Sequence, residues 1–157
     1  MRKGYKYAFI ILSVLLLVSA CSNKNDTKKS SLALIKTTQP KPMKLSSNIK
    51  ESLPSKVKKE VAAIKEIYDV AVIEGNKTIL VAYKVKHLYR FRMKSIEKKL
   101  TSRLEKEYPN EKFVVSSDYK IFLEAVRLRE DLKSGRISKK EAKKRFKTIV
   151  KLKEELT

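Results

Sequence analysis

The sequence predicts an α+β fold: a small three-stranded sheet with two helices on one face, in the order helix-strand-strand-helix-strand, followed by a C-terminal helical hairpin. Three observations lead to this prediction. Apolar residues recur at helical spacing over 54–68 and 93–108, β-branched runs lie at 70–74, 78–86 and 112–116, and two capped amphipathic segments follow residue 118. Placing both helices on one face of the sheet buries their apolar stripes together.

The first helix is expected to begin near residue 54, because Ser52 offers an N-cap and Pro54 suits a first helical turn. Its apolar face is formed by Val57, Val61, Ile64 and Tyr68. Asp69 then breaks the helical period. A hairpin follows, in which Gly75-Asn76 joins two strands, because both residues tolerate the positive φ of a tight connection.

In the second strand one alternating set should face the core: Ile79, Val81, Tyr83 and Val85. The second helix ends at Pro109-Asn110, and a third strand follows at 112–116. A right-handed crossover through this helix predicts the third strand beside the first and parallel to the second. The predicted core comprises Val61, Ile64, Val72, Val81, Tyr83, Ile96, Leu100, Leu104 and Val114.

The C-terminal hairpin is predicted from its caps. Asp118 caps its first helix, Gly135 supplies a positive-φ exit, and Ser138 with Glu141 forms a capping box for the second. The second helix has a narrow apolar stripe of Ala142, Phe146, Ile149 and Val150, opposite a strongly basic face. Either the stripe packs on the domain, which we favour, or this helix lies on a membrane surface.

The N-terminus is typical of an exported lipoprotein. Arg2, Lys3 and Lys6 precede an apolar run over 8–20, which is too short to span a bilayer but suits a secretory signal. The residues Val18-Ser19-Ala20-Cys21 resemble the lipobox of bacterial lipoproteins, which implies that Cys21 receives a diacylglycerol and becomes the mature N-terminus. An uncleaved anchor is the alternative. We therefore expect a signal peptide at 1–20, a lipidated N-terminus and flexible linker at 21–53, an α/β domain at 54–120 and the hairpin at 121–157.

The charge points to an anionic partner. The net charge is +21, and +18 once the three cations of the signal are removed. Outside the cytoplasm such a chain is attracted to anionic lipid, teichoic acid, peptidoglycan or an acidic protein, whereas nucleic acid is not expected unless the protein handles incoming DNA. The alternative is that the lysines only keep the surface soluble. Predicted contacts lie where cations stand beside aromatic or apolar residues: Lys84, Lys86, Arg90, Arg92, Lys94, Lys140, Lys143, Lys144 and Lys147.

No catalytic site, metal site or cofactor is expected. Cys21 is the only cysteine and His87 the only histidine, so thiolate chemistry and histidine-rich metal sites are disfavoured. Three glycines do not make a phosphate-cradling loop. Carboxylates such as Glu105 and Glu107 sit among lysines, where helical ion pairing explains them. We interpret the protein as non-enzymatic, with a wall hydrolase as a weaker alternative.

A family resemblance extends this interpretation. Four features carry the resemblance: the lipobox, the polar tether, the run Ile64-Lys65-Glu66-Ile67-Tyr68-Asp69-Val70-Ala71-Val72-Ile73 and the later Phe113-Val114-Val115-Ser116-Ser117-Asp118. Over about residues 21–120 the chain resembles the sporulation lipoprotein family of the YhcN/YlaJ type. The resemblance implies a lipoprotein of spore-forming Gram-positive bacteria, associated with spore membranes and germination, without catalytic residues. The many lysines and the C-terminal hairpin depart from it. The alternative is a vegetative extracytoplasmic lipoprotein that binds wall polymer or incoming DNA.

Overall fold

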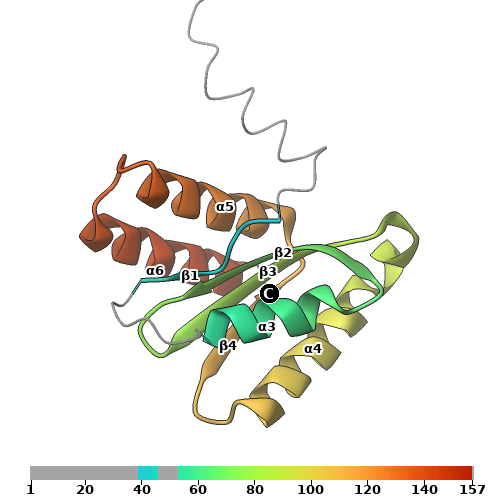
Figure 1. Ribbon diagram of the computed structural model, residues 1–157. Coiled ribbons are helices and arrows are strands. Elements are labelled where there is room, and N and C mark those ends of the chain that lie inside the picture. The colour runs from blue at the N-terminus through green and yellow to red at the C-terminus, as the bar shows by residue number, and fades with distance from the viewer. Residues whose placement is uncertain (1–38, 46–52, 157) are drawn as a thin grey trace, which may run out of the picture. The chain divides into compact units, whose positions relative to one another are not determined.

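A computed structural model describes residues 39–45 and 53–156 of the chain. The elements are β1 (Met43–Lys44), α3 (Leu53–Ala62), β2 (Ile67–Glu74), β3 (Thr78–Val85), the 3₁₀ helix η2 (His87–Arg92), α4 (Met93–Glu107), β4 (Lys112–Ser116), α5 (Tyr119–Lys133) and α6 (Lys139–Glu155) (Figure 1). The predicted signal, Cys21, most of the predicted linker and the N-cap Ser52 lie outside the described residues.

The fold is α+β, as predicted, but its sheet has four strands in the order β1-β2-β3-β4. The additional strand, β1, lies within the segment predicted as linker, where Met43 and Lys44 pair in parallel with the edge of β2. The amide of Leu45 extends the ladder by donating to the Glu74 carbonyl at 2.9 Å. The prediction of a linker up to residue 53 is therefore wrong for residues 39–45.

The predicted strand order is also wrong in one respect. β3 and β4 run parallel, as expected, but they are direct neighbours, and β2 does not lie between them. The antiparallel β2–β3 hairpin leaves one edge on each strand, and the edge of β2 is occupied by β1. The crossover through α4 therefore returns the chain to the open edge of β3.

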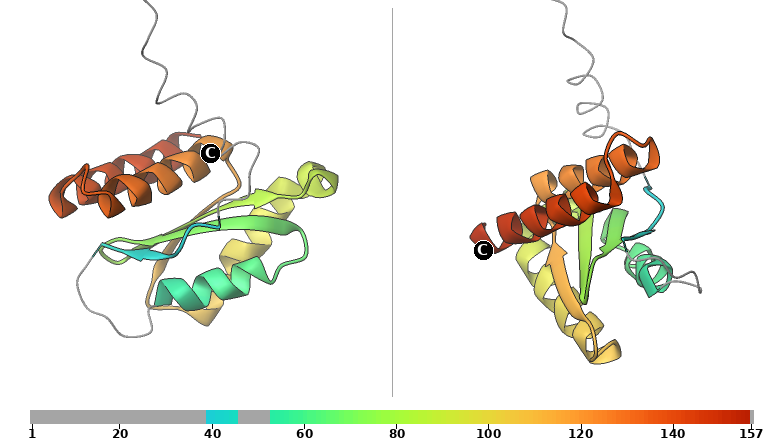
Figure 2. Two further views of the ribbon diagram at one scale, coloured as in Figure 1. Left: turned by 45° about the horizontal axis from the view of Figure 1, so that its top comes forward. Right: turned by 90° about the vertical axis from the view of Figure 1, so that its left-hand side faces the viewer.

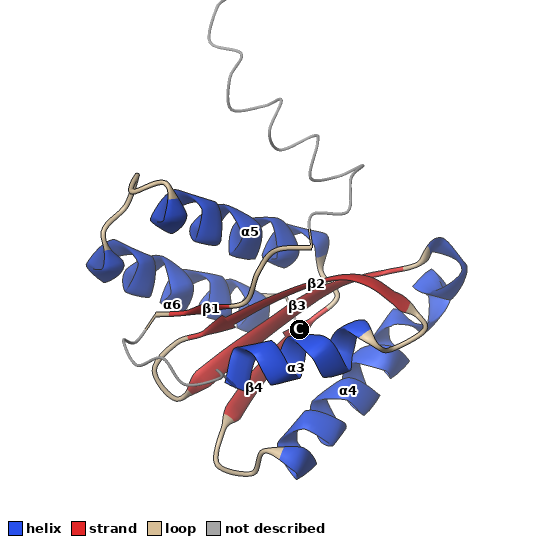
Figure 3. Ribbon diagram, in the orientation of Figure 1, coloured by secondary structure: helices blue, strands red, loops and turns tan. Residues whose placement is uncertain are grey.

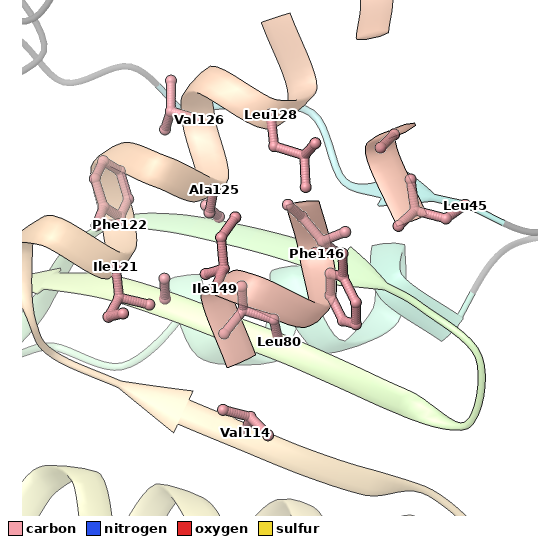
Figure 4. Close-up of a cluster of buried hydrophobic side chains, with 14 residues drawn as sticks. Leu45, Leu80, Val114, Ile121, Phe122, Ala125, Val126, Leu128, Phe146 and Ile149 are labelled. Carbon is pink, nitrogen blue, oxygen red and sulfur yellow. The ribbon is translucent and has the colours of Figure 1, made fainter. Parts of the chain in front are cut away.

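Helices cover both faces of the sheet, so the molecule has two apolar layers (Figures 2 and 3). On one face α3 and α4 enclose a cluster of Val57, Val61, Ile67, Val70, Val72, Ile79, Val81, Tyr83, Val85, Ile96, Leu100, Leu104, Phe113 and Val115. On the other, α5 and α6 cover Leu45, Ala71, Ile73, Leu80, Ala82, Val114, Ile121, Phe122, Ala125, Val126, Leu128, Ala142, Phe146 and Ile149 (Figure 4). The C-terminal hairpin therefore packs its apolar stripes on the sheet.

The core differs from the predicted one, mainly because of this second layer. The set of β3 residues expected to face away from the core, including Leu80 and Ala82, is buried beneath α5 and α6. Val114 is buried in that layer and not with the other predicted core residues. Ile64 is only partly buried.

The first helix is shorter than its apolar spacing predicts. It ends at Ala62, Ile64 lies in the following turn, and Tyr68 belongs to β2. Residues 67–74 pair along β3, with an irregularity between Ile67 and Asp69. Pairing with β3 therefore determines the conformation here, and the helical spacing of Ile64 and Tyr68 is coincidental.

The local signals of the C-terminal hairpin are confirmed. Asp118 accepts hydrogen bonds from the amides of Lys120 and Ile121 at 2.7 and 3.0 Å. Gly135 leaves α5 with a φ of +72°. Ser138 and Glu141 form the reciprocal capping box at the start of α6.

The β2–β3 turn lies where predicted, although the conformational reason differs. Positive φ falls on Lys77, at 59°, and not on Gly75 or Asn76. Gly75 is needed instead because a Cβ atom there would lie 2.3 Å from the ring of Phe146. The glycine lets α6 approach the turn.

We expect Gly75→Ala to lower the free energy of unfolding by about 1–3 kcal/mol, because the methyl group must displace the buried Phe146 ring. Urea unfolding measures the loss. Asn76→Ala, at the neighbouring exposed position, is the control and should change stability by about 0.5 kcal/mol or less. Equal stability of the two variants would contradict the close approach of α6.

Candidate anion-binding surface

The helix η2 projects from the end of β3 and exposes two large apolar side chains. Leu88 is 85% exposed and Phe91 is 100% exposed. A 3₁₀ helix has three residues per turn, so positions 88 and 91 lie on the same side. Tyr89 and Met93 instead pack against the α3–α4 core and fix η2 to the domain. Tyr89 therefore packs at the edge of the core, whereas Phe91 does not.

Four exposed cations lie close to these apolar side chains in the sequence: Lys86, Arg90, Arg92 and Lys94. The stretch from 86 to 94 contains no acidic residue, and the first carboxylate after it is Glu97. Within residues 39–45 and 53–156, the ion pairs involve none of these four side chains. We call residues 86–94 the tip.

A groove of about 810 Å³ runs beside the tip. Its lining includes four cations (Arg90, Lys94, Lys98 and Lys153), two carboxylates (Glu97 and Asp118), and hydroxyls from Thr101, Ser102, Ser116 and Ser117. Glu97 accepts hydrogen bonds from the amide and hydroxyl of Ser117, both at 2.9 Å, and pairs with Lys153 at 2.9 Å. The groove therefore has an excess of positive charge, and its carboxylates are already engaged.

A second basic region lies on the N-terminal half of α6. Lys140, Lys143, Lys144 and Lys147 are all exposed. Lys143 and Lys147 line a groove of about 540 Å³ between α6 and the β2–β3 turn. No ion pair among the described residues involves these four lysines.

Arg145 does not belong to this basic face. Its guanidinium pairs with Asp131 of α5 at 2.5 Å and with Glu124 at 3.5 Å, so it joins the two helices of the hairpin. Burial alone raises the pKa of Asp131, but hydrogen bonds from Arg136 and Arg145 outweigh it and hold this pKa below its ordinary value. Part of the charge on α6 is therefore structural.

The two basic regions stand at opposite ends of β3. Gly75, just before the strand, touches Phe146 of α6, whereas η2 begins just after the strand ends at Val85. Figure 1 shows the start of α6 and η2 at opposite sides of the sheet. The predicted contacts thus form two surfaces that do not share one small ligand.

Lys84 is a correction to the predicted contacts, because it is buried. Its side chain is 4% exposed and pairs at 3.3 Å with Asp69, whose side chain is fully buried. The ammonium also lies 5.0 Å from the ring centre of Tyr68 and 4.9 Å from that of Phe122, which is cation–π geometry. Lys84 therefore stabilises the α5 side of the sheet and is not available to a partner.

The ion pair also fixes the segment before β1. The backbone amide of Gln39 donates to Asp69 at 3.0 Å, and its side-chain amide donates to the Tyr68 carbonyl at 2.7 Å. Lys58 donates to the Pro40 carbonyl at 2.6 Å, and burial lowers the pKa of this lysine. The described chain thus enters the folded unit at the end of the sheet where β2 begins and β3 ends.

Sequence reasoning missed the exposed apolar pair and two groove cations, Lys98 and Lys153. The spacing of three between Leu88 and Phe91 was the available signal, because it places both on one side of a 3₁₀ turn. Among residues 39–45 and 53–156, no group of histidine, cysteine and carboxylate side chains is arranged to hold a metal ion. In the same part of the chain, no helix is long and apolar enough to cross a membrane.

The likeness to the sporulation lipoproteins rests on the residues quoted above alone. No family model, no curated protein and no solved structure matches the chain.

Proposed function

We propose that the protein is a non-enzymatic, lipid-anchored module of the cell envelope that holds an anionic component beside the membrane. The observation that carries this proposal is the pair of basic surfaces, the tip and the start of α6, whose exposed cations form no ion pair with a carboxylate of the described residues. Like charges gathered without counter-charges repel each other, and an anion bound there relieves the repulsion.

The lipid anchor does not account for this charge. Two acyl chains hold a protein on a bilayer without electrostatic help, whereas a single chain needs a polybasic patch. With a diacylglyceryl group on Cys21, attachment does not depend on the cations, which can therefore serve a separate binding role. The proposal is therefore one of anchoring by lipid and binding by charge.

The carboxylates of the tip groove support a binding role over a catalytic one. Glu97 is held by Ser117 and Lys153, and Asp118 accepts the first amides of α5. A general acid or base must be within reach of substrate with a tuned pKa. These two side chains instead stabilise the junctions of α4 and α5.

The test is a binding titration of residues 22–157, which contain the whole compact unit Thr37–Thr157. The probes are phosphatidylglycerol vesicles, teichoic acid and peptidoglycan, each at low and at physiological salt. We expect binding to at least one probe, with affinity falling about tenfold or more as salt rises, because screening and counterion release act on exposed charges.

Charge reversals locate the contacts. Arg90→Glu/Arg92→Glu reverses the tip, and Lys143→Glu/Lys144→Glu reverses the start of α6. Lys56→Glu/Lys59→Glu on α3 is the matched control, because it makes the same change of net charge at two exposed positions. If all three variants bind equally well, or if the parent binds none of the probes at low salt, the charge only keeps the protein soluble and the proposal fails.

The proposal also concerns the stage of the cell cycle at which the protein acts. The resemblance favours a role in sporulation or germination, and the alternative is a vegetative lipoprotein that binds wall polymer or incoming DNA. A reporter fused to the upstream promoter separates them: forespore-specific expression supports the first, and expression during growth supports the second.

A further inference from the structure

We infer that the tip is a membrane-insertion device: Leu88 and Phe91 enter the acyl boundary of an anionic bilayer while the surrounding cations contact lipid phosphates. The inference rests on the proposed function and names its anionic component at this end of the molecule as membrane lipid. It assigns a role to two apolar side chains that neither the core nor the electrostatic proposal uses.

The first argument is that the exposed apolar side chains cluster at one end of the described part of the molecule. Among the described residues the exposed large hydrophobic side chains are Leu88, Phe91 and Leu156, at 85%, 100% and 53% exposure. Phe91 and Leu156 line the same groove, and Leu88 lies in the same short helix as Phe91. All three therefore gather at one end of the molecule, as expected of an interaction surface.

The second argument is the chemistry around them. The apolar pair is bordered by Lys86, Arg90, Arg92 and Lys94, with no carboxylate in the stretch. Apolar side chains flanked by cations suit the boundary between acyl chains and anionic headgroups. A protein partner buries an apolar patch equally well, but four cations that form no ion pair within the described residues, so close to a small apolar patch, favour a surface with dense negative charge.

The third argument is the position of the tip relative to the chain's entry. Gln39, the first described residue, bonds to Tyr68 and Asp69, and Asp69 pairs in register with Lys84. Lys84 stands two residues before Lys86, the first residue of the tip. Gln39, at the beginning of the described residues, and the tip therefore lie at the same end of the sheet, and the lysines at the start of α6 lie at the opposite end.

The fourth argument is rigidity. Tyr89 and Met93 pack on the core, and η2 continues directly into α4. A preorganised tip loses little conformational entropy on insertion, so the apolar burial is not offset by ordering.

The experiment uses residues 22–157 and the absence of tryptophan from the chain. Phe91→Trp places a single fluorophore on the tip, and Asn76→Trp places one at the exposed β2–β3 turn as the matched control. With phosphatidylglycerol vesicles we expect a blue shift of emission and quenching by brominated acyl chains for Phe91→Trp only. A Phe91→Trp spectrum that does not change while the vesicles bind overturns insertion.

A second variant separates insertion from charge. Leu88→Ser/Phe91→Ser keeps every cation and changes two side chains that are 85% and 100% exposed, so thermal unfolding should match the parent. We expect its affinity for vesicles to fall about tenfold or more, with teichoic acid binding unchanged. Parent-like vesicle binding of this variant overturns the inference and leaves the proposed function standing. A parent that binds teichoic acid but not vesicles also overturns the inference and leaves the proposed function standing. A parent that binds none of the probes overturns both the inference and the proposed function.

Self-association through the tip is a distinct outcome that light scattering detects. A parent dimer that Leu88→Ser/Phe91→Ser converts to a monomer, without loss of vesicle affinity, assigns the apolar pair to a second copy of the chain and overturns insertion.

Discussion

Removing the Asp69 carboxylate by Asp69→Ala is expected to lower the free energy of unfolding by about 3–5 kcal/mol, because it takes the counter-charge from a buried ammonium. The Lys84 and Asp69 side chains are 4% and 0% exposed, so water does not replace the lost partner. The variant also removes the acceptor of the Gln39 amide. Both losses fall on the same end of the sheet.

The measurement is urea unfolding with an unchanged m-value. Asp69→Asn removes the charge but keeps a side-chain oxygen that accepts from the Gln39 amide. It should therefore lower the free energy of unfolding by less than Asp69→Ala does. Glu155→Ala is the matched control, because it breaks an ion pair with Lys151 at 3.6 Å on the surface. The Lys151 and Glu155 side chains are 76% and 60% exposed, so this variant should lower the free energy of unfolding by about 0–1 kcal/mol. Equal losses for Asp69→Ala and Glu155→Ala would show that the buried pair behaves like a surface pair.

The parts of the fold that the sequence predicts well are those fixed by neighbouring residues. Asp118, Gly135 and the Ser138–Glu141 pair act within one turn of themselves, so their chemistry is visible in a short window. The helices α5 and α6 begin directly after the predicted caps Asp118 and Ser138, and α5 ends just before Gly135. The strand at 112–116 is equally clear, because Pro109-Asn110 ends the preceding helix and the apolar run Phe113-Val114-Val115 follows.

The parts that sequence reasoning missed depend on residues far away in the chain. β1 has two residues, Met43 and Lys44, and becomes a strand only because the edge of β2 is open to it. The helix predicted to reach Tyr68 ends at Ala62, because pairing with β3 decides the conformation from Ile67 onward. No local pattern contains either contact.

The sequence identifies the basic residues of the candidate site but not how their side chains are placed. The stretch 84–94 was identified as basic and aromatic, yet Lys84 is buried because the strand register places Asp69 opposite it. Large aromatic side chains are usually buried at least in part. The 3₁₀ turn reverses that expectation by directing Tyr89 to the core and Phe91 to solvent.

Cys21→Ser is expected to abolish maturation completely, and this is the largest effect predicted for function. A thiolate is a far better nucleophile than a hydroxyl at neutral pH, so serine cannot take the diacylglyceryl group that the lipobox resemblance implies. The precursor then keeps residues 1–20 and the positive charges of Arg2, Lys3 and Lys6.

The readout is the intact mass and N-terminal peptide of the chain recovered from membranes, because an uncleaved apolar signal also holds a protein in the membrane and fractionation alone does not discriminate. The parent should begin at a diacylglyceryl Cys21, and Cys21→Ser should begin at Met1. Ser19→Ala is the matched control, since it keeps a small residue before the cysteine and should mature normally. A mature parent chain cut anywhere else, or a Cys21→Ser chain cut at residue 21, means that the lipobox is not used. Among the described residues, the tip then remains as the proposed membrane contact, and attachment through it is reversible by salt.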